Sequence, residues 1–201
     1  MQSLPPVGFW SYARQDEQES HGRMAALRRI LARELQARMR SGRQVSMFQD
    51  IGTIDFGGDW QGKIADALAE ASFLVVVMTP AYFRSQWCVE ELLRFRAREQ
   101  ALGRSDLIFP IHYMNIDKID PSDRESCLDC RVWDILRGRQ ELDLRDIQQI
   151  DLERSPAVWS RVGGLARAIQ SALQPAIISS YFNDTLRSKY FRNLLAHSRE
   201  F

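Results

Sequence analysis

Short apolar runs alternate along the chain with longer stretches in which apolar residues recur every three or four positions. The spacing of Met24, Leu27, Leu31 and Leu35, for example, places all four on one face of a helix. Runs bounded by turn residues and rich in β-branched side chains predict strands. Five such strands are expected, over residues 7–12, 45–48, 73–79, 107–113 and 141–144. Strands that alternate with helices predict an α/β domain with a parallel sheet.

The helices expected between these strands cover residues 20–41, 63–70 and 81–101, with one short helix between 115 and 139. An amphipathic helix through Val158–Leu173 should follow and end at Pro175, which cannot continue the hydrogen-bond ladder. The run 73–79 (FLVVVMT) is apolar throughout, as in a central strand covered on both faces. The order fits a flavodoxin-like, doubly wound five-stranded parallel sheet with helices on both faces, which binds ligands beyond the carboxyl ends of its strands.

The domain is predicted to occupy residues 1–174, followed by a C-terminal tail at 175–201. The tail contains a helical apolar stripe over 183–197. Such a stripe must be buried against something. The tail could cap the domain, contact another copy of the chain, or lead into a further domain.

The composition and charge of the chain limit its structural class, its cellular location and its binding partners. The 201 residues are 45% hydrophobic and 26% charged, as in globular proteins. No apolar run approaches the roughly 20 residues of a membrane span, and the first residues lack a secretory pattern, so a cytoplasmic protein is expected. The formal charge of +1 gives no reason to expect a membrane or nucleic-acid partner. Arginines crowd between Arg23 and Arg43, either as a solvated helix face or as a patch for a subunit or nucleic acid.

Several familiar kinds of site are missing from the sequence. There is no GxGxxG after the first strand, no GxxxxGK[ST], no GxSxG and no HExxH, which argues against a dehydrogenase, an NTPase, a serine hydrolase and a zincin. Cys127 and Cys130 have metal-ligand spacing, but no second pair completes four ligands, so no metal site is predicted. His112, within an apolar strand, is interpreted as a core histidine.

One constellation does suggest chemistry. The stretch TPAYFRSQWCVEELLRF places Trp87 and Glu91 four residues apart on one helix face, beside a buried stripe, while Glu90 points to solvent. An indole can stack on a planar base while a carboxylate binds the hydroxyls of the attached ribose. The spacing is equally compatible with Trp87 in the core and Glu91 as a surface acid.

Three motifs occur together, in order: SYARQD at 11–16, then Asp50, Ile54, Gly57 and Trp60, then TPAYFRSQWCVEEL at 79–92. Over residues 5–174 the chain resembles Toll/interleukin-1 receptor (TIR) domains, particularly bacterial NAD+-cleaving and plant ones. Thr79 replaces the serine usual at that position.

The resemblance implies an NAD+ nucleosidase that hydrolyses the nicotinamide–ribose bond or forms a cyclic ADP-ribose isomer, with NAD+ as substrate and no cofactor or metal. Glu91 would be the catalytic acidic residue, and Trp87 would line the same pocket. The remaining ligand-framing residues would be Tyr12, Arg14, Asp50, Phe56, Gly57 and Trp60. Simpler roles for these residues stay open, such as an ion pair of Arg14 with Asp16 or Asp50, loop hydrogen bonds of Asp50, and anchoring by Trp60.

The resemblance also implies activation by self-assembly, because a neighbouring copy supplies the loop after the second strand to the site. An upstream sensor domain or chain would trigger the assembly, and the enzyme would act in antiviral defence of a bacterial cell. The alternatives are a non-catalytic TIR scaffold for protein–protein interaction and a nucleotide sensor without turnover.

Overall fold

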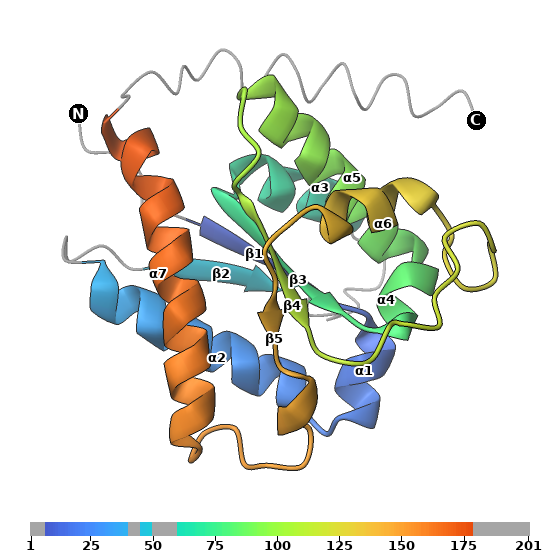
Figure 1. The fold of residues 1–201 in the computed structure, drawn as a ribbon. Helices are drawn as coiled ribbons and strands as arrows, with labels where there is room; N and C mark the ends of the chain where they lie inside the picture. The colour runs from blue at the N-terminus through green and yellow to red at the C-terminus, as the bar shows by residue number, and fades with distance from the viewer. Residues whose placement is uncertain (1–6, 40–44, 50–59, 179–201) are drawn as a thin grey trace.

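The computed structural model describes residues 7–39, 45–49 and 60–178 (Figure 1). Their centre is a five-stranded, all-parallel sheet in the order β2-β1-β3-β4-β5, with each crossover made by helical segments. This confirms the predicted flavodoxin-like topology. The strands are β1 (Val7–Ser11), β2 (Ser46–Gln49), β3 (Phe73–Met78), β4 (Ile108–His112) and β5 (Leu142–Asp143).

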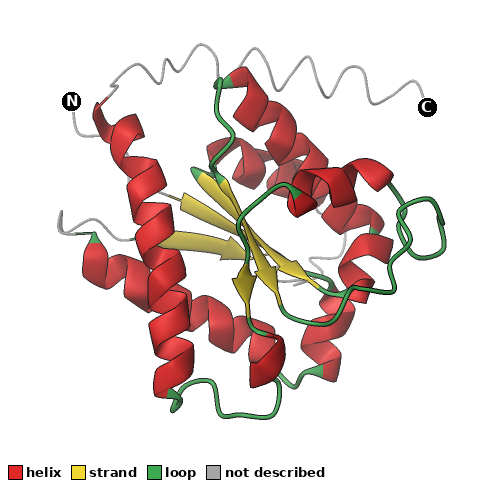
Figure 2. Ribbon diagram, viewed as in Figure 1, coloured by secondary structure: helices red, strands yellow, loops and turns green. Residues whose placement is uncertain are grey.

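Helices cover both faces of the sheet (Figure 2). On one face lie α2 (Arg23–Arg38) and α7 (Pro156–Ile178), and on the other lie α3 (Trp60–Glu70), α5 (Gln86–Ala101) and α6 (Cys130–Arg137). Three short helical segments complete the described chain: α1 (Arg14–Glu19), α4 (Pro80–Arg84) and the 3₁₀ turn η1 (Arg145–Ile147). No helix in the described ranges has an apolar stretch long enough to cross a bilayer.

The central strand β3 supplies both cores. All six of its residues are buried, and alternate side chains enter opposite layers. Phe73, Val75 and Val77 pack toward α2 and α7, and the intervening residues pack toward α3 and α5. A strand covered on both faces was predicted from its uninterrupted apolar sequence, and the structure confirms it.

The contact between β1 and β3 leaves no space for a side chain at Gly8. A Cβ atom built there would lie 2.4 Å from Cζ of Phe73, whose ring is fully buried. We expect Gly8→Ala to lower the free energy of unfolding by about 1–3 kcal/mol, because the Phe73 ring must shift within a packed core. Urea denaturation measures this loss. The matched substitution Gly138→Ala, where a Cβ meets nothing closer than 3.7 Å, should change stability by less than about 0.5 kcal/mol. Equal effects of the two substitutions would contradict the packing argument.

The helix predicted over 81–101 is in fact two helices, α4 and α5, separated at Ser85. The backbone of Ser85 is extended, and its side chain accepts a hydrogen bond from the backbone nitrogen of Cys88, so it caps α5. Thr79 caps α4 in the same way, by accepting from the nitrogen of Tyr82. Serine at a helix start satisfies an orphan N–H group, which favours a new helix over continuation of the old one.

One further expectation about helices was wrong, and one helix was not predicted. α7 continues through Pro175 to Ile178. The φ angle to which proline is restricted lies in the helical range, so an interior proline weakens a helix without always ending it. The boundary predicted between residues 174 and 175 therefore falls inside this helix, and the helix predicted over 183–197 lies outside the described residues. α1 was not predicted, since its sequence, RQDEQE, carries no apolar stripe.

Several arginines of α2 contact neighbouring segments of the domain, although Arg29 and Arg33 are exposed, as expected for a solvated helix face. Arg23 donates to the hydroxyl of Tyr113 (2.8 Å) and to the carbonyl of Ile147 (2.6 Å). Other members of the row act similarly: Arg28 donates to the Met47 carbonyl, Arg29 pairs with Glu153, and Arg33 stacks on the Trp159 ring. The guanidinium groups thus fasten α2 to neighbouring segments.

Candidate active site

A cleft of about 250 Å³ lies where β1 and β3 end. Its walls come from the segment after β1, from α4 after β3, and from the first turns of α5. The carboxyl ends of adjacent parallel strands meet at one edge of the sheet, which is where flavodoxin-like folds bind ligands. The residues that line the cleft are Trp10, Tyr12, Ala13, Arg14, Gln15, Ala81, Arg84, Ser85, Trp87, Cys88 and Glu91.

The structure brings Trp87 and Glu91 together in this cleft. Glu91 is only 6% exposed, whereas Trp87, one helical turn earlier, is 42% exposed. The alternative in which Trp87 is core and Glu91 is a surface acid is therefore excluded. Glu90 does not line the cleft and forms an ion pair with Arg94. A buried acid beside an open aromatic ring can hold a polar ligand against an apolar wall.

The carboxylate of Glu91 is tied to the end of β1. The Ser11 hydroxyl donates to Oε2 of Glu91 at 2.5 Å, and the phenol oxygen of Tyr82 lies 3.2 Å from the same hydroxyl. The phenol also donates to the backbone carbonyl of Cys88 at 3.3 Å. Complete burial raises the pKa of Tyr82 well above its ordinary value, so its proton stays in place at neutral pH.

A second buried hydrogen bond joins the same two motifs. The Thr79 hydroxyl, just after β3, donates to Oδ2 of Asp16 in α1 at 2.6 Å. The Asp16 side chain is only 2% exposed, and this burial raises its pKa above the usual aspartate value, more than the Thr79 hydrogen bond lowers it. Side-chain hydrogen bonds thus hold the SYARQD and TPAYFRSQWCVEEL segments together at three points, Ser11–Glu91, Ser11–Tyr82 and Asp16–Thr79.

Asp16 should make the stability of the protein depend on pH. Because its folded-state pKa is raised, the native state binds a proton more tightly than the unfolded chain does. Its contribution is fully present below the ordinary pKa of 3.8 and is lost as pH rises through the folded-state value. We therefore expect Asp16→Asn, which keeps an acceptor for Thr79, to be more stable relative to wild type at neutral pH than at pH 3. Thermal denaturation at both pH values measures the difference, and a gain of equal size at both would contradict it.

The other residues predicted to frame a ligand are divided by the structure. Tyr12 and Arg14 line the cleft, the first buried and the second exposed. Asp50, Phe56 and Gly57 lie outside the described residues, and Trp60 begins α3 with only its backbone described.

Sequence reasoning missed Ser11, Asp16, Thr79 and Tyr82 as partners within the site, and Arg84 as a wall of the cleft. A signal was present in the sequence, because Ser11 and Thr79 are polar residues at the ends of apolar strands. Polar groups buried at such positions must find a hydrogen-bond partner.

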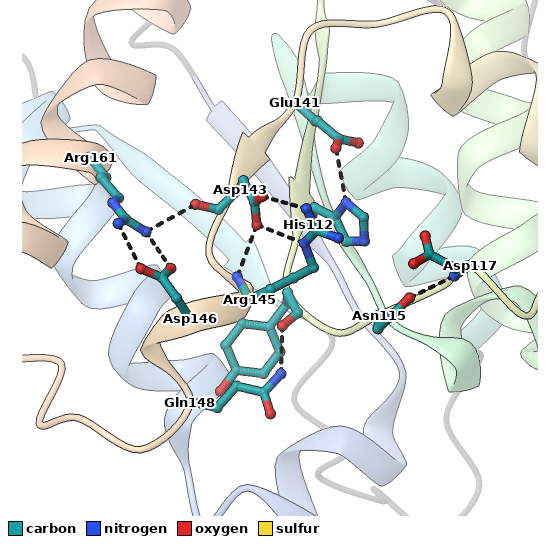
Figure 3. A network of polar contacts seen from close by, with 10 residues as sticks. His112, Asn115, Asp117, Glu141, Asp143, Arg145, Asp146, Gln148 and Arg161 are labelled. Carbon is teal, nitrogen blue, oxygen red and sulfur yellow. Dashed lines mark hydrogen bonds and ion pairs between the residues drawn. The ribbon is translucent and has the colours of Figure 1, made fainter.

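His112 belongs to a separate polar network at the ends of β4 and β5 (Figure 3). It is buried, as predicted, with Nδ1 2.9 Å from Oε1 of Glu141. Next to it, hydrogen bonds from Arg145 hold the pKa of Asp143 well below its usual range, and Arg161 of α7 pairs with Asp146. None of these residues lines the cleft. The network fastens β5 and η1 to α7 and is structural in character.

The cysteines are free thiols, and the CxxC pair consists of a buried Cys127 and an exposed Cys130. Burial raises the pKa of Cys127. Within the ranges that the structure describes, no cluster of three or more histidine, cysteine or acidic side chains could hold a metal ion.

Fold and cleft together define a flavodoxin-like α/β domain with an acid-bearing cleft at its topological switch point. A family model described as the TIR domain matches residues 9–157, and the chain belongs to this family. It is 28% identical over 78 residues to the TMV resistance protein N of Nicotiana glutinosa, and this match covers 39% of the chain and 6% of the relative. The chain thus spans a small fraction of that relative's length.

Two solved TIR-domain structures are similar to the chain. The TIR domain of the Toll-related receptor TRR-2 from Hydra magnipapillata is 20% identical with a TM-score of 0.45, covering 80% of this chain and 97% of that one. The TIR domains of the activated Roq1 resistosome, which directly recognises the pathogen effector XopQ, are 18% identical with a TM-score of 0.39, covering 96% and 99%.

Proposed function

We propose that the protein cleaves NAD+ at the bond between nicotinamide and ribose. The observation that carries the proposal is the buried Glu91 carboxylate in the wall of the cleft, one turn from the open indole of Trp87. Membership of the TIR family, in which the sequence resemblance implies this chemistry, supports the same assignment. NAD+ is the substrate here, and no cofactor or metal ion takes part.

The chemistry needs only one carboxylate. Nicotinamide in NAD+ is a cationic pyridinium, so when its bond to C1′ of ribose breaks, the electron pair moves to the ring nitrogen and a neutral base leaves. No general acid is required, in contrast to ordinary glycoside hydrolysis, where an alkoxide leaves and two carboxylates share the work. Positive charge develops on the ribose as an oxocarbenium ion, and a fixed anion beside it lowers the barrier.

The remaining cleft residues fit the other parts of this substrate. Arg14 and Arg84 place positive charge on the cleft wall, where the diphosphate of a dinucleotide would be bound. The half-open Trp87 ring offers a stacking surface for the nicotinamide. Attack of water on C1′ with loss of a proton completes hydrolysis, and attack by the adenine or a hydroxyl of the same molecule gives a cyclic product instead.

We also propose that catalysis depends on self-association through TIR–TIR contacts, in a cytoplasmic protein that acts in antiviral defence and responds to an upstream sensor. A composite site formed between copies makes the rate depend on concentration, because the competent species is then the assembly. A non-catalytic scaffold would assemble without turnover, and a nucleotide sensor would bind NAD+ and return it unchanged.

The test is to incubate the purified chain with NAD+ over a range of protein concentrations and to follow nicotinamide by chromatography. We expect nicotinamide release that rises more steeply than linearly with protein concentration. Assembled protein that binds NAD+ but releases nothing would favour a sensor. Assembled protein that neither binds nor cleaves NAD+ would favour a scaffold. Either result would overturn the proposed enzyme.

A further inference from the structure

Behind the cleft, three side chains from three different elements form a buried, hydrogen-bonded cluster. Ser11 ends β1, Tyr82 lies in α4, and Glu91 lies in α5. Ser11 and Tyr82 are 1% and 0% exposed, and neither is among the residues that line the cleft, whereas Glu91 is. The two hydroxyl groups are therefore not in contact with a ligand in the cleft. They act on it through the cleft residues that they contact, which are Glu91 for Ser11 and the backbone of Cys88 for Tyr82.

The protons of this group can be assigned from its geometry. A serine hydroxyl has one proton to donate, and an ionised carboxylate can only accept. The Ser11–Glu91 separation of 2.5 Å is typical of a hydroxyl that donates to a charged carboxylate. With that proton given to Glu91, the Ser11 oxygen can only accept from Tyr82. The single phenol proton of Tyr82 is then shared between two acceptors, the Cys88 carbonyl at 3.3 Å and the Ser11 oxygen at 3.2 Å.

This arrangement favours one charge state and one orientation of the acid. A buried carboxylate without donors would lose its charge, whereas hydrogen bonds to the charged form keep it ionised. Ser11 is also fixed in the sheet, so its hydroxyl restrains the glutamate rotamer by holding Oε2 in place. The Tyr82 phenol is protonated at neutral pH, as in any tyrosine, and burial raises its pKa further, so Tyr82 remains a donor.

We propose that Ser11 and Tyr82 are positioning residues for Glu91. Their hydroxyls form a buried relay, Tyr82 to Ser11 to Glu91, that holds the carboxylate ionised and fixed in the cleft wall. This inference rests on the proposed NAD+ cleavage and adds two residues that the ligand does not touch. No proton moves along the relay during the reaction, since the leaving nicotinamide needs none.

The relay predicts a particular kinetic signature for Ser11→Ala. We expect kcat to fall about 10- to 100-fold, as for the loss of one hydrogen bond to a charged group, with KM nearly unchanged because Ser11 does not line the cleft. The acid limb of the kcat–pH profile should move to higher pH, since the ionised carboxylate loses its donor. The other titratable groups of the cleft wall are Tyr12, Arg14, Arg84 and Cys88, and all are retained in this variant.

Two further variants distinguish the effect of losing a hydroxyl group from the effect of losing side-chain volume. Ser11→Thr keeps the hydroxyl in a strand position that suits a β-branched residue, and it should restore most of the kcat and the wild-type profile. Tyr82→Phe keeps the buried ring and should shift kcat and the acid limb in the same direction as Ser11→Ala, by less. Circular dichroism shows whether the Ser11→Ala variant folds. If it does not, Tyr82→Phe alone tests the proposal.

The matched controls are a serine and a tyrosine whose hydroxyls bond elsewhere. Ser122→Ala removes a hydroxyl bound to Asp120 in an exposed loop, and Tyr113→Phe removes a buried phenol bound to Arg23. Both should keep the wild-type kcat and pH profile per folded molecule. If wild-type protein cleaves NAD+ while Tyr82→Phe and folded Ser11→Ala keep its kcat and acid limb, the relay is overturned and the proposed function stands. If wild-type protein releases no nicotinamide, both are overturned.

Discussion

Replacing Glu91 with glutamine should reduce nicotinamide release from NAD+ by at least about 10²-fold, the scale for losing one preorganised electrostatic group. Glutamine keeps the size of the side chain and can still accept a hydrogen bond from Ser11, which lies 2.5 Å from Oε2 in the wild type. What it removes is the negative charge beside the developing ribose cation. Initial rates at saturating NAD+, compared at equal protein concentration, measure the effect.

The neighbouring acid provides the matched control for this substitution. Glu90 lies one position away on α5, pairs with Arg94, and does not line the cleft. Glu90→Gln removes the same charge from the same helix and should leave the rate within about twofold of wild type, since Glu90 does not line the cleft and its ion pair with Arg94 is only partly buried. Full turnover by the Glu91→Gln variant, or equal losses in the two variants, would remove Glu91 from the reaction.

The second large effect is on the free energy of unfolding, and it concerns Glu99, another buried acidic residue of α5. Glu99 is fully buried and accepts hydrogen bonds from Arg139 (2.5 Å), Arg96 (2.7 Å) and the backbone nitrogen of Leu107 (2.8 Å). Glu99→Ala would leave the mostly buried guanidinium of Arg139 and a buried N–H group without this partner. We expect a loss of about 3–5 kcal/mol in the free energy of unfolding, as when one member of a buried ion pair is removed.

Chemical denaturation measures this loss, and an exposed ion pair provides the control. Glu153 pairs with Arg29 across the surface, where both side chains are 56% exposed. Glu153→Ala should therefore cost less than about 1 kcal/mol. If Glu99→Ala costs no more than Glu153→Ala, the buried contacts of Glu99 with Arg139 and Leu107 do not stabilise the fold as predicted.

The sheet was predictable because the alternation of apolar runs and helical stripes follows directly from burial. The uninterrupted apolar run over Phe73–Met78 indicated a strand covered on both faces, and the structure has it at the centre of the sheet. The errors arose where one residue competes with periodicity. The cap formed by Ser85 divides a helix that the apolar pattern continues, and Pro175 permits a helix that it was expected to end.

The site was predictable only in part, because spacing along a helix does not determine exposure. Glu91 and Glu99 both lie on the buried side of α5. Glu91 lines the cleft, whereas Glu99 is fully buried and forms ion pairs with arginines. The difference depends on which segments pack against each end of the helix. The Ser11 and Asp16 contacts likewise join residues more than 60 positions apart, which no local pattern reveals.

We propose that the carboxylate of Glu91 lies where the nicotinamide-bearing ribose of NAD+ is bound. The structure of the Glu91→Gln variant crystallised with intact NAD+ tests it most directly. We expect the ribose hydroxyls within hydrogen-bond distance of residue 91, with the nicotinamide beside Trp87 and the diphosphate toward Arg14 and Arg84. NAD+ bound with its ribose away from residue 91, or an empty cleft at saturating NAD+, would contradict it.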